Sequence, residues 1–194
     1  MRKRQGYFLR IASVLMLLTL LMATASAKSV EKQREEINAL SQKILVRLYD
    51  KYPHADKVIQ NCYGYATMGA TGSQFGIFGD SHGRGLAVCN ETGEKYYMKM
   101  QEYKLGLGVG IKEFDLVFIF GTPESWNSFI SGKFKFGAEA EAAATDSING
   151  ASLEGATMVG EDMWVYQTTT KGATLGVSLK GMSIYRNKKL NGEE

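Results

Sequence analysis

The sequence predicts an α+β fold in which many short antiparallel strands form a barrel or a strongly curved sheet with capping helices. From residue 63 onward, glycines recur every few residues and apolar side chains alternate with polar ones. Such alternation is typical of strands that bury one face. Turn signals separate the segments at residues 79–83, 90–93 and 147–150. So many short strands favour closure or strong curvature of the sheet.

Residues 1–27 are expected to be a secretory signal peptide. Four basic residues in the first ten precede an apolar run over residues 11–22, and Ala25-Ser26-Ala27 forms a small-x-small cleavage site. A membrane anchor is the alternative, but the run is shorter than the roughly 20 residues that span a bilayer. No cysteine follows the run, so we expect no lipid anchor and a soluble mature chain that begins at Lys28.

The charge of the mature chain argues against bulk nucleic-acid binding. The leader holds four of the 23 basic residues and none of the 20 acidic ones, so residues 28–194 carry a net charge of −1. The longest basic run is Lys188-Lys189, whereas nucleic-acid binding needs a clustered cationic surface. The 167 remaining residues fit one domain, residues 28–194.

Cysteine and histidine spacing gives no metal motif. Cys62 and Cys89 are the two cysteines, and His54 and His82 are isolated from each other and from them. The thiols are interpreted either as a disulfide or as two buried, unpaired side chains, and the spacing does not decide between these. We expect no metal and no cofactor.

An amphipathic helix is expected over residues 30–50. Its apolar stripe includes Ile37, Leu40, Ile44 and Leu48. Packing against its own domain is the favoured interpretation, because the polar face mixes acidic and basic residues, and membrane association is the alternative.

Two shorter helices are expected to start at the two prolines. Pro53 suits the first turn of a helix through residue 59, and Pro123 suits a helix over residues 122–131. In the latter, Trp126, Phe129 and Ile130 recur at helical spacing and are expected to face the core.

Ten strands are expected from the alternation. In residues 105–111 apolar side chains alternate with glycine, so one face is bare backbone suited to close approach, while residues 114–120 are apolar enough to be covered on both faces. The expected strands lie at residues 63–70, 74–79, 85–90, 96–102, 104–111, 114–120, 134–144, 163–169, 173–180 and 183–186.

No catalytic set is visible. Residues 106–110 (GLGVG) lack the Lys-Ser/Thr of a phosphate-binding loop, and Ser125 and Ser128 have no histidine near them in sequence. Glu139 and Glu141 are interpreted as part of a solvated charge ladder. Arg84, between two glycines, is either a solvated turn residue or an anion contact beside open backbone N–H groups.

Several motifs, in order, resemble the lipid-binding SYLF domain family. They include 64–66 (GYA), 83–88 (GRGLAV), 97–100 (YMKM), 114–120 (FDLVFIF), 129–132 (FISG), 136–140 (FGAEA), 164–167 (WVYQ), 171–172 (KG), 179–181 (LKG), Tyr185 and 190–191 (LN). The resemblance implies a compact α/β domain without catalytic activity. It also implies phosphoinositides as ligands of eukaryotic members and anionic phospholipids, as proposed, for bacterial ones.

On this basis the sequence predicts a non-catalytic periplasmic module that binds anionic phospholipid headgroups at a membrane surface. The alternative is an envelope structural or stress protein that binds a protein partner through an exposed strand edge or helix. The basic side chains expected to contact lipid lie next to glycine-rich strands and are Arg84, Lys99, Lys133, Lys135 and Lys171.

Overall fold

The computed structural model describes residues 29–132, 147–148, 150–172 and 181–193. The chain divides into two compact units, residues 1–36 and residues 37–194. In the first unit, residues 29–36 are helical, and the guanidinium of Arg34 lies 3.6 Å from the carboxylate of Glu31 one turn earlier. The second unit contains the sheet.

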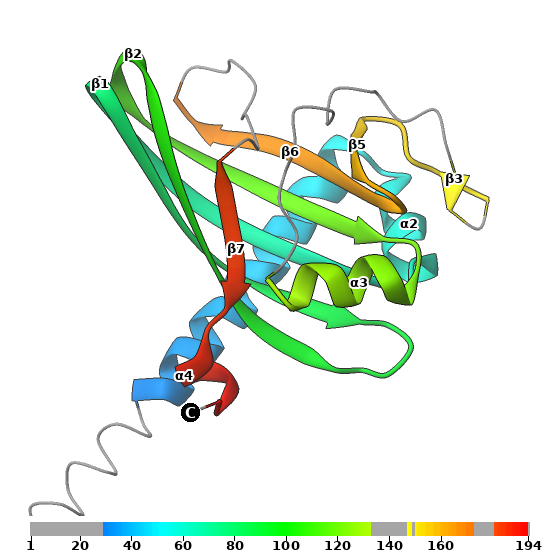
Figure 1. The fold of residues 1–194 in the computed structure, drawn as a ribbon. Coiled ribbons are helices and arrows are strands. Elements are labelled where there is room, and N and C mark those ends of the chain that lie inside the picture. The colour runs from blue at the N-terminus through cyan, green and yellow to red at the C-terminus, as the bar shows by residue number, and fades with distance from the viewer. Residues whose placement is uncertain (1–28, 133–146, 149, 173–180, 194) are drawn as a thin grey trace, which may run out of the picture. The chain divides into compact units, whose positions relative to one another are not determined.

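The second unit begins with a helix over residues 37–51, called helix 37–51 below. The elements that follow are α2 (Ala55–Asn61), β1 (Gly64–Cys89), β2 (Lys95–Phe120), α3 (Pro123–Ile130), β3 (Ser147–Ile148), β4 (Ala151–Ser152), β5 (Ala156–Gly160), β6 (Met163–Lys171), β7 (Met182–Arg186) and α4 (Lys188–Asn191) (Figure 1).

The main sheet is antiparallel and strongly curled, as predicted. In the described part of the chain its strand order is β1-β2-β6-β5, and β7 pairs with the first part of β2. β1 and β2 pair along nearly their whole length, and Figure 1 shows them running together to a common tip and turning back. Behind the tip the two halves of β1 lie against each other, since Thr67 Oγ1 donates to the Leu86 carbonyl (3.3 Å) and Ser73 Oγ donates to Asp80 Oδ1 (2.5 Å).

The prediction of many short strands was wrong for residues 63–120. Two strands of 26 residues each replace the six that were expected, and the turn predicted at residues 79–83 is extended backbone inside β1. These glycines let a paired ribbon bend instead of breaking it, because they bring no Cβ into the fold. One register shift, between Gly76 and Phe78, interrupts the β1–β2 pairing.

Other expected turns and strands have mixed outcomes. The turn at residues 90–93 is confirmed, with Gly93 at φ +73°, and Gly150 at φ +79° lies between β3 and β4 as expected. The strands expected at 134–144 and 173–180, together with Glu139 and Glu141, lie outside the described residues.

Each face of the sheet supports its own core. The inner face carries α3, whose Trp126 and Phe129 contact the rings of Phe118 and Phe120 at centroid distances of 4.8–5.5 Å. The outer face carries helix 37–51 and α2, which pack on alternate residues of β2, including Val117 and Ile119. Residues 114–120 are therefore buried on both sides, as predicted.

The helices follow the sequence closely. Thr122 caps α3 and accepts from the Ser125 backbone N–H (3.4 Å), with Pro123 in the first turn as expected. Pro53 lies in a turn just before α2, which begins at Ala55 rather than at the proline. The stripe of helix 37–51 is buried on its own unit, with Ile44 and Leu48 at most 2% exposed.

A partly buried ion pair attaches helix 37–51 to the outer face. Arg47 Nε lies 2.6 Å from Asp115 Oδ2, and the Asp115 side chain is 6% exposed. Burial raises the pKa of the Asp115 carboxyl, and the hydrogen bond from Arg47 partly opposes that rise. Cys62 and Cys89 are both free thiols, and both are buried.

Candidate functional site

The structure places two of the predicted basic residues directly opposite each other. Arg84 of β1 pairs in register with Lys99 of β2, and Lys99 pairs in register with Tyr185 of β7. All three side chains are exposed and project from the outer face, because their neighbours Met98, Met100 and Ile184 fill the inner core. Two basic side chains therefore lie next to each other on adjacent strands of this face.

The glycines beside Arg84 serve the packing of β1 against itself. A Cβ on Gly85 would overlap the Thr67 carbonyl oxygen, and one on Gly83 would lie 3.1 Å from the Gly69 carbonyl oxygen. These two residues therefore let the second half of β1 approach the first half, while Arg84 points to the opposite face. The anion-binding turn considered for this motif is not present, since residues 83–88 form part of the ladder with β2.

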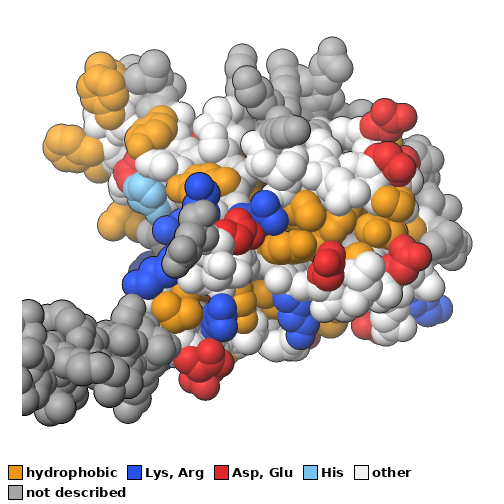
Figure 2. All heavy atoms as spheres, turned by 60° about the horizontal axis from the view of Figure 1, so that its bottom comes forward, with side chains coloured by type: hydrophobic (Ala, Val, Ile, Leu, Met, Phe, Trp, Pro, Cys, Tyr) orange, Lys and Arg blue, Asp and Glu red, His pale blue; other side chains and the backbone are white. Residues whose placement is uncertain are grey.

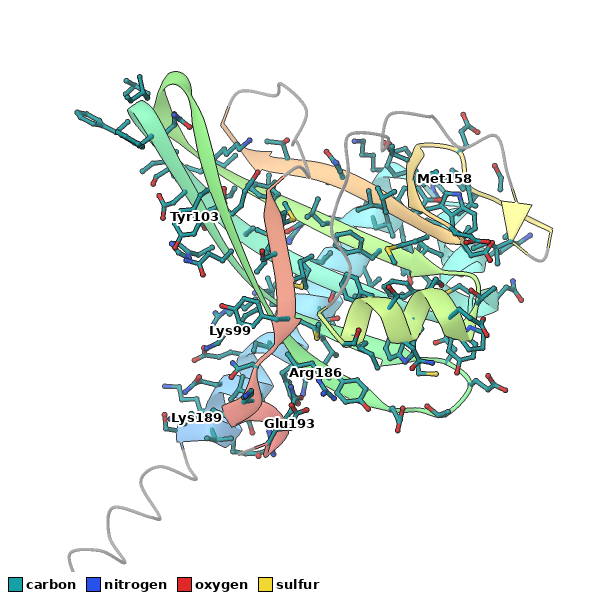
Figure 3. The ribbon with its side chains drawn as sticks, viewed as in Figure 1. Lys99, Tyr103, Met158, Arg186, Lys189 and Glu193 are labelled. Carbon is teal, nitrogen blue, oxygen red and sulfur yellow. The ribbon has the colours of Figure 1, made fainter. Side chains whose placement is uncertain are left out.

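Two further lysines lie at the same end of the sheet. The side chain of Asn191 in α4 accepts from the Tyr97 backbone N–H and donates to its carbonyl, each at 2.9 Å, two residues from Lys99. This contact holds α4, which carries the exposed Lys188 and Lys189, beside the part of β2 that contains Lys99. Figure 3 shows Lys189 below Lys99 at the lower left. We call Arg84, Lys99, Lys188 and Lys189 the cationic band.

The other predicted contacts do not join this band in the described part of the chain. Lys171 ends β6 and is exposed, and its ammonium lies 3.8 Å from the Glu113 carboxylate. Glu113 belongs to the half of β2 beyond the bend from Lys99. Lys133 and Lys135 lie outside the described residues.

The sequence reasoning missed an exposed apolar surface where β1 and β2 turn back. Six of the eight exposed large hydrophobic side chains in the described residues lie here, and Figure 2 shows hydrophobic side chains on the lobe that protrudes at upper left. The available signal was the absence of charge from residues 72–79 and 105–111. We call this surface the apolar tip: Phe75, Ile77, Phe78, Tyr103, Val109 and Ile111.

A hollow at the start of α3 has the wrong charge for an anion. A cavity of about 500 Å³ is lined by the carboxylates of Glu124, Glu161 and Asp162. The Ser125 hydroxyl at its edge donates to the Thr122 carbonyl (2.9 Å) as part of the helix cap. Within the described ranges, no group of three or more His, Cys, Asp or Glu residues is arranged to hold a metal ion.

No helix in the part of the chain that the structure describes is long and apolar enough to cross a membrane. Over 163 residues the chain is 26% identical to beta cell expansion factor A of Aeromonas veronii. The alignment covers 84% of this chain, and the chain spans about 60% of the length of that relative. Residues 101–193, from β2 to α4, match the family model described as Ysc84, Las17-binding protein actin regulator. The chain therefore carries a Ysc84/SYLF family domain, as its motifs predicted.

Proposed function

We propose that this protein binds anionic phospholipid headgroups at a membrane surface, as a peripheral and non-catalytic module. The observation that carries the proposal is the exposed Arg84–Lys99 pair, set in register on two strands and flanked by Tyr185. A guanidinium binds a phosphate through two parallel hydrogen bonds, and an ammonium adds a point charge beside it. The pair thus has the chemistry of a phosphodiester contact.

The cationic band accounts for weak binding by itself. Each Lys or Arg near an anionic surface contributes about 1 kcal/mol, so four contribute about 4 kcal/mol. That free energy corresponds to a dissociation constant of about 1 mM. Stable attachment therefore needs an apolar contribution in addition to the charges.

The remaining predicted contacts are part of the same proposal. Lys133 and Lys135 are proposed to add charge to the surface, on the strength of the sequence pattern. Lys171 is proposed as a weaker contact, because the Glu113 carboxylate already lies beside it.

The proposal includes export. The basic first residues, the apolar run and the small residues at 25–27 support cleavage after Ala27 and a periplasmic mature protein over residues 28–194. The intact mass of protein recovered from the periplasm tests this. A mass that includes residues 1–27 would contradict it.

Co-sedimentation with vesicles tests the lipid-binding proposal. Protein that begins at Lys28 is mixed with phosphatidylcholine vesicles and with vesicles that also contain phosphatidylglycerol, at low and moderate salt. We expect binding to the anionic vesicles that weakens with salt, since exposed charges are screened beyond about 8 Å at physiological ionic strength.

A matched pair of variants locates the contact. Arg84→Glu with Lys99→Glu should abolish anionic-vesicle binding. Lys43→Glu with Lys57→Glu makes the same change in net charge at exposed positions on helix 37–51 and α2, and it should leave binding intact. Equal loss of binding in both double variants would show that binding depends on net charge and not on the Arg84–Lys99 pair. Absence of binding by the unmodified protein would favour a protein partner instead.

A further inference from the structure

The apolar tip leaves aromatic and aliphatic side chains in solvent where soluble proteins usually bury them. Phe75 and Val109 face each other across the two strands, and each is 84% exposed. Phe78 is 66% exposed, and Tyr103, on the opposite strand, is 70% exposed. A contiguous apolar surface of this kind marks an interaction site rather than random exposure.

The tip stands beyond the rest of the sheet. β7 pairs with residues 98–102 of β2, and β6 pairs with residues 113–120. Between them, residues 103–112 have β1 as their one strand neighbour in the described part of the chain. The tip is therefore a two-stranded finger that is uncharged at residues 72–79 and 105–111.

We propose that the apolar tip inserts into the interfacial region of an anionic lipid bilayer while the cationic band contacts the headgroups. This inference rests on the proposed function and supplies the apolar contribution that the charges lack. A protruding finger enters a fluid bilayer without a matching groove, and Phe, Tyr, Ile and Val are side chains that partition into the membrane interface.

The placement of charge along the finger favours a bilayer as the occupant. Beyond the register shift, Phe78 and Arg84 project from the same face of β1, six residues and about 20 Å apart along the strand. Tyr103 and Lys99 repeat this order on β2 (Figure 3). Apolar side chains at the end and cations behind them match the order of acyl chains and phosphates in an anionic leaflet.

The one carboxylate on the face between Phe78 and Arg84 is partly exposed and has two partners within the protein. Asp80 accepts from Ser73 Oγ (2.5 Å) and lies 2.7 Å from His82 Nε2. The Ser73 hydrogen bond and His82 lower the pKa of Asp80, so the carboxylate stays ionised and its charge is directed at these two partners. It therefore opposes an anionic surface less than a solvated carboxylate would.

Depth-dependent quenching tests insertion directly. Phe75→Trp places an indole at the tip, and the native Trp126 and Trp164 are 2% and 5% exposed, so their emission serves as an internal reference. With phosphatidylglycerol vesicles that contain bromine-labelled acyl chains, we expect the tip indole to be quenched and to shift to shorter wavelength. Binding of this variant without quenching would overturn the inference and leave the proposed function standing.

A second pair of variants separates the tip from nonspecific apolar contact. Phe75→Ser with Phe78→Ser should weaken anionic-vesicle binding by at least about tenfold, because each phenyl ring loses its burial in lipid. Val46→Ser removes another exposed apolar side chain, 57% exposed on helix 37–51, and should have no effect.

The remaining outcomes also decide the question. Unchanged binding of the double serine variant overturns insertion even where Arg84→Glu with Lys99→Glu abolishes binding. Failure of every variant and of the unmodified protein to bind vesicles overturns the inference together with the proposed function. Sedimentation equilibrium that shows a dimer, dissociated by the serine substitutions, would assign the tip to a second copy of this chain and overturn the lipid inference.

Discussion

Two parts of the β1–β2 ribbon, one of its ends and the tip where it turns back, differ in what covers them. At residues 114–120 of β2, a third strand pairs alongside, α3 covers the inner face and helix 37–51 covers the outer face. At residues 103–112 the same two strands pair with each other but lack a further strand in the described part of the chain. Phe118 is 0% exposed at the covered end, whereas Phe75 is 84% exposed at the tip.

This difference separates stability from function within one pair of strands. Burial of an aromatic ring stabilises the fold only where the fold provides neighbours for it. Side chains at the covered end are therefore expected to determine the free energy of unfolding. Side chains at the tip are expected to determine what the protein attaches to.

The largest expected effect is truncation of a ring at the covered end. Phe118→Ala should lower the free energy of unfolding by about 3–5 kcal/mol, since it leaves a cavity beside Phe129, whose ring centroid is 5.1 Å away. Phe75→Ala should change it by less than about 0.5 kcal/mol. Urea denaturation followed by circular dichroism measures both, and similar losses in the two variants would remove the distinction between the covered end and the tip.

The next effect distinguishes two glycines of β1. Gly85→Ala should cost about 1–3 kcal/mol, because the added Cβ overlaps the Thr67 carbonyl oxygen and the backbone must shift. Gly76→Ala, at the tip, has no atom within 4 Å of its Cβ and should cost about 1 kcal/mol, through its φ of +65° alone. A smaller loss for Gly85→Ala in the same denaturation assay would show that the halves of β1 are not closely packed.

The glycines also explain how far the sequence predicted this fold. Alternation identified the buried faces and the curved antiparallel sheet, but glycine predicts a turn and a bend inside a strand equally well. If residues 63–120 had been interpreted as two continuous strands, Arg84 would have been predicted opposite Lys99. The turn at residues 90–93 pairs Val88 with Lys95, and counting four residues further along each strand pairs Arg84 with Lys99. The exposure of Phe75 was missed because apolar alternation is the same in a buried strand and in an exposed one, and the absence of charge from residues 72–79 was the remaining signal.

A third prediction concerns the ion pair that attaches helix 37–51 at the covered end. Arg47→Met should lower the free energy of unfolding by about 1–2 kcal/mol at neutral pH. This estimate is at the low end of the range for hydrogen bonds to charged groups, because Arg47 is partly exposed. Burial raises the pKa of Asp115, and Arg47 lowers it, so the substitution should raise this pKa further.

The pH dependence of that loss has a definite sign. A carboxyl whose pKa is raised by folding stabilises the fold at low pH and loses this contribution as the pH rises from its ordinary value, about 3.9, to the raised value. The difference between wild type and Arg47→Met should therefore shrink as the pH falls into the range where Asp115 is protonated. A difference that stays constant with pH would show that Asp115 ionisation is not coupled to Arg47.

The smallest expected effect on stability comes from a cysteine introduced at the tip, which should also differ most clearly in accessibility from the two native cysteines. Phe75→Cys should leave the free energy of unfolding almost unchanged and should react at once with a thiol reagent, because position 75 is 84% exposed. The native Cys62 and Cys89 are 4% and 1% exposed, and burial raises the pKa of Cys62 to about 12, so its reactive thiolate is scarce at neutral pH. One thiol per molecule should therefore react with the reagent in the folded Phe75→Cys variant, and three should react in urea. If anionic vesicles protect the introduced thiol and phosphatidylcholine vesicles do not, the tip lies in the bilayer. Slow labelling without lipid would mean that the tip is already covered by protein.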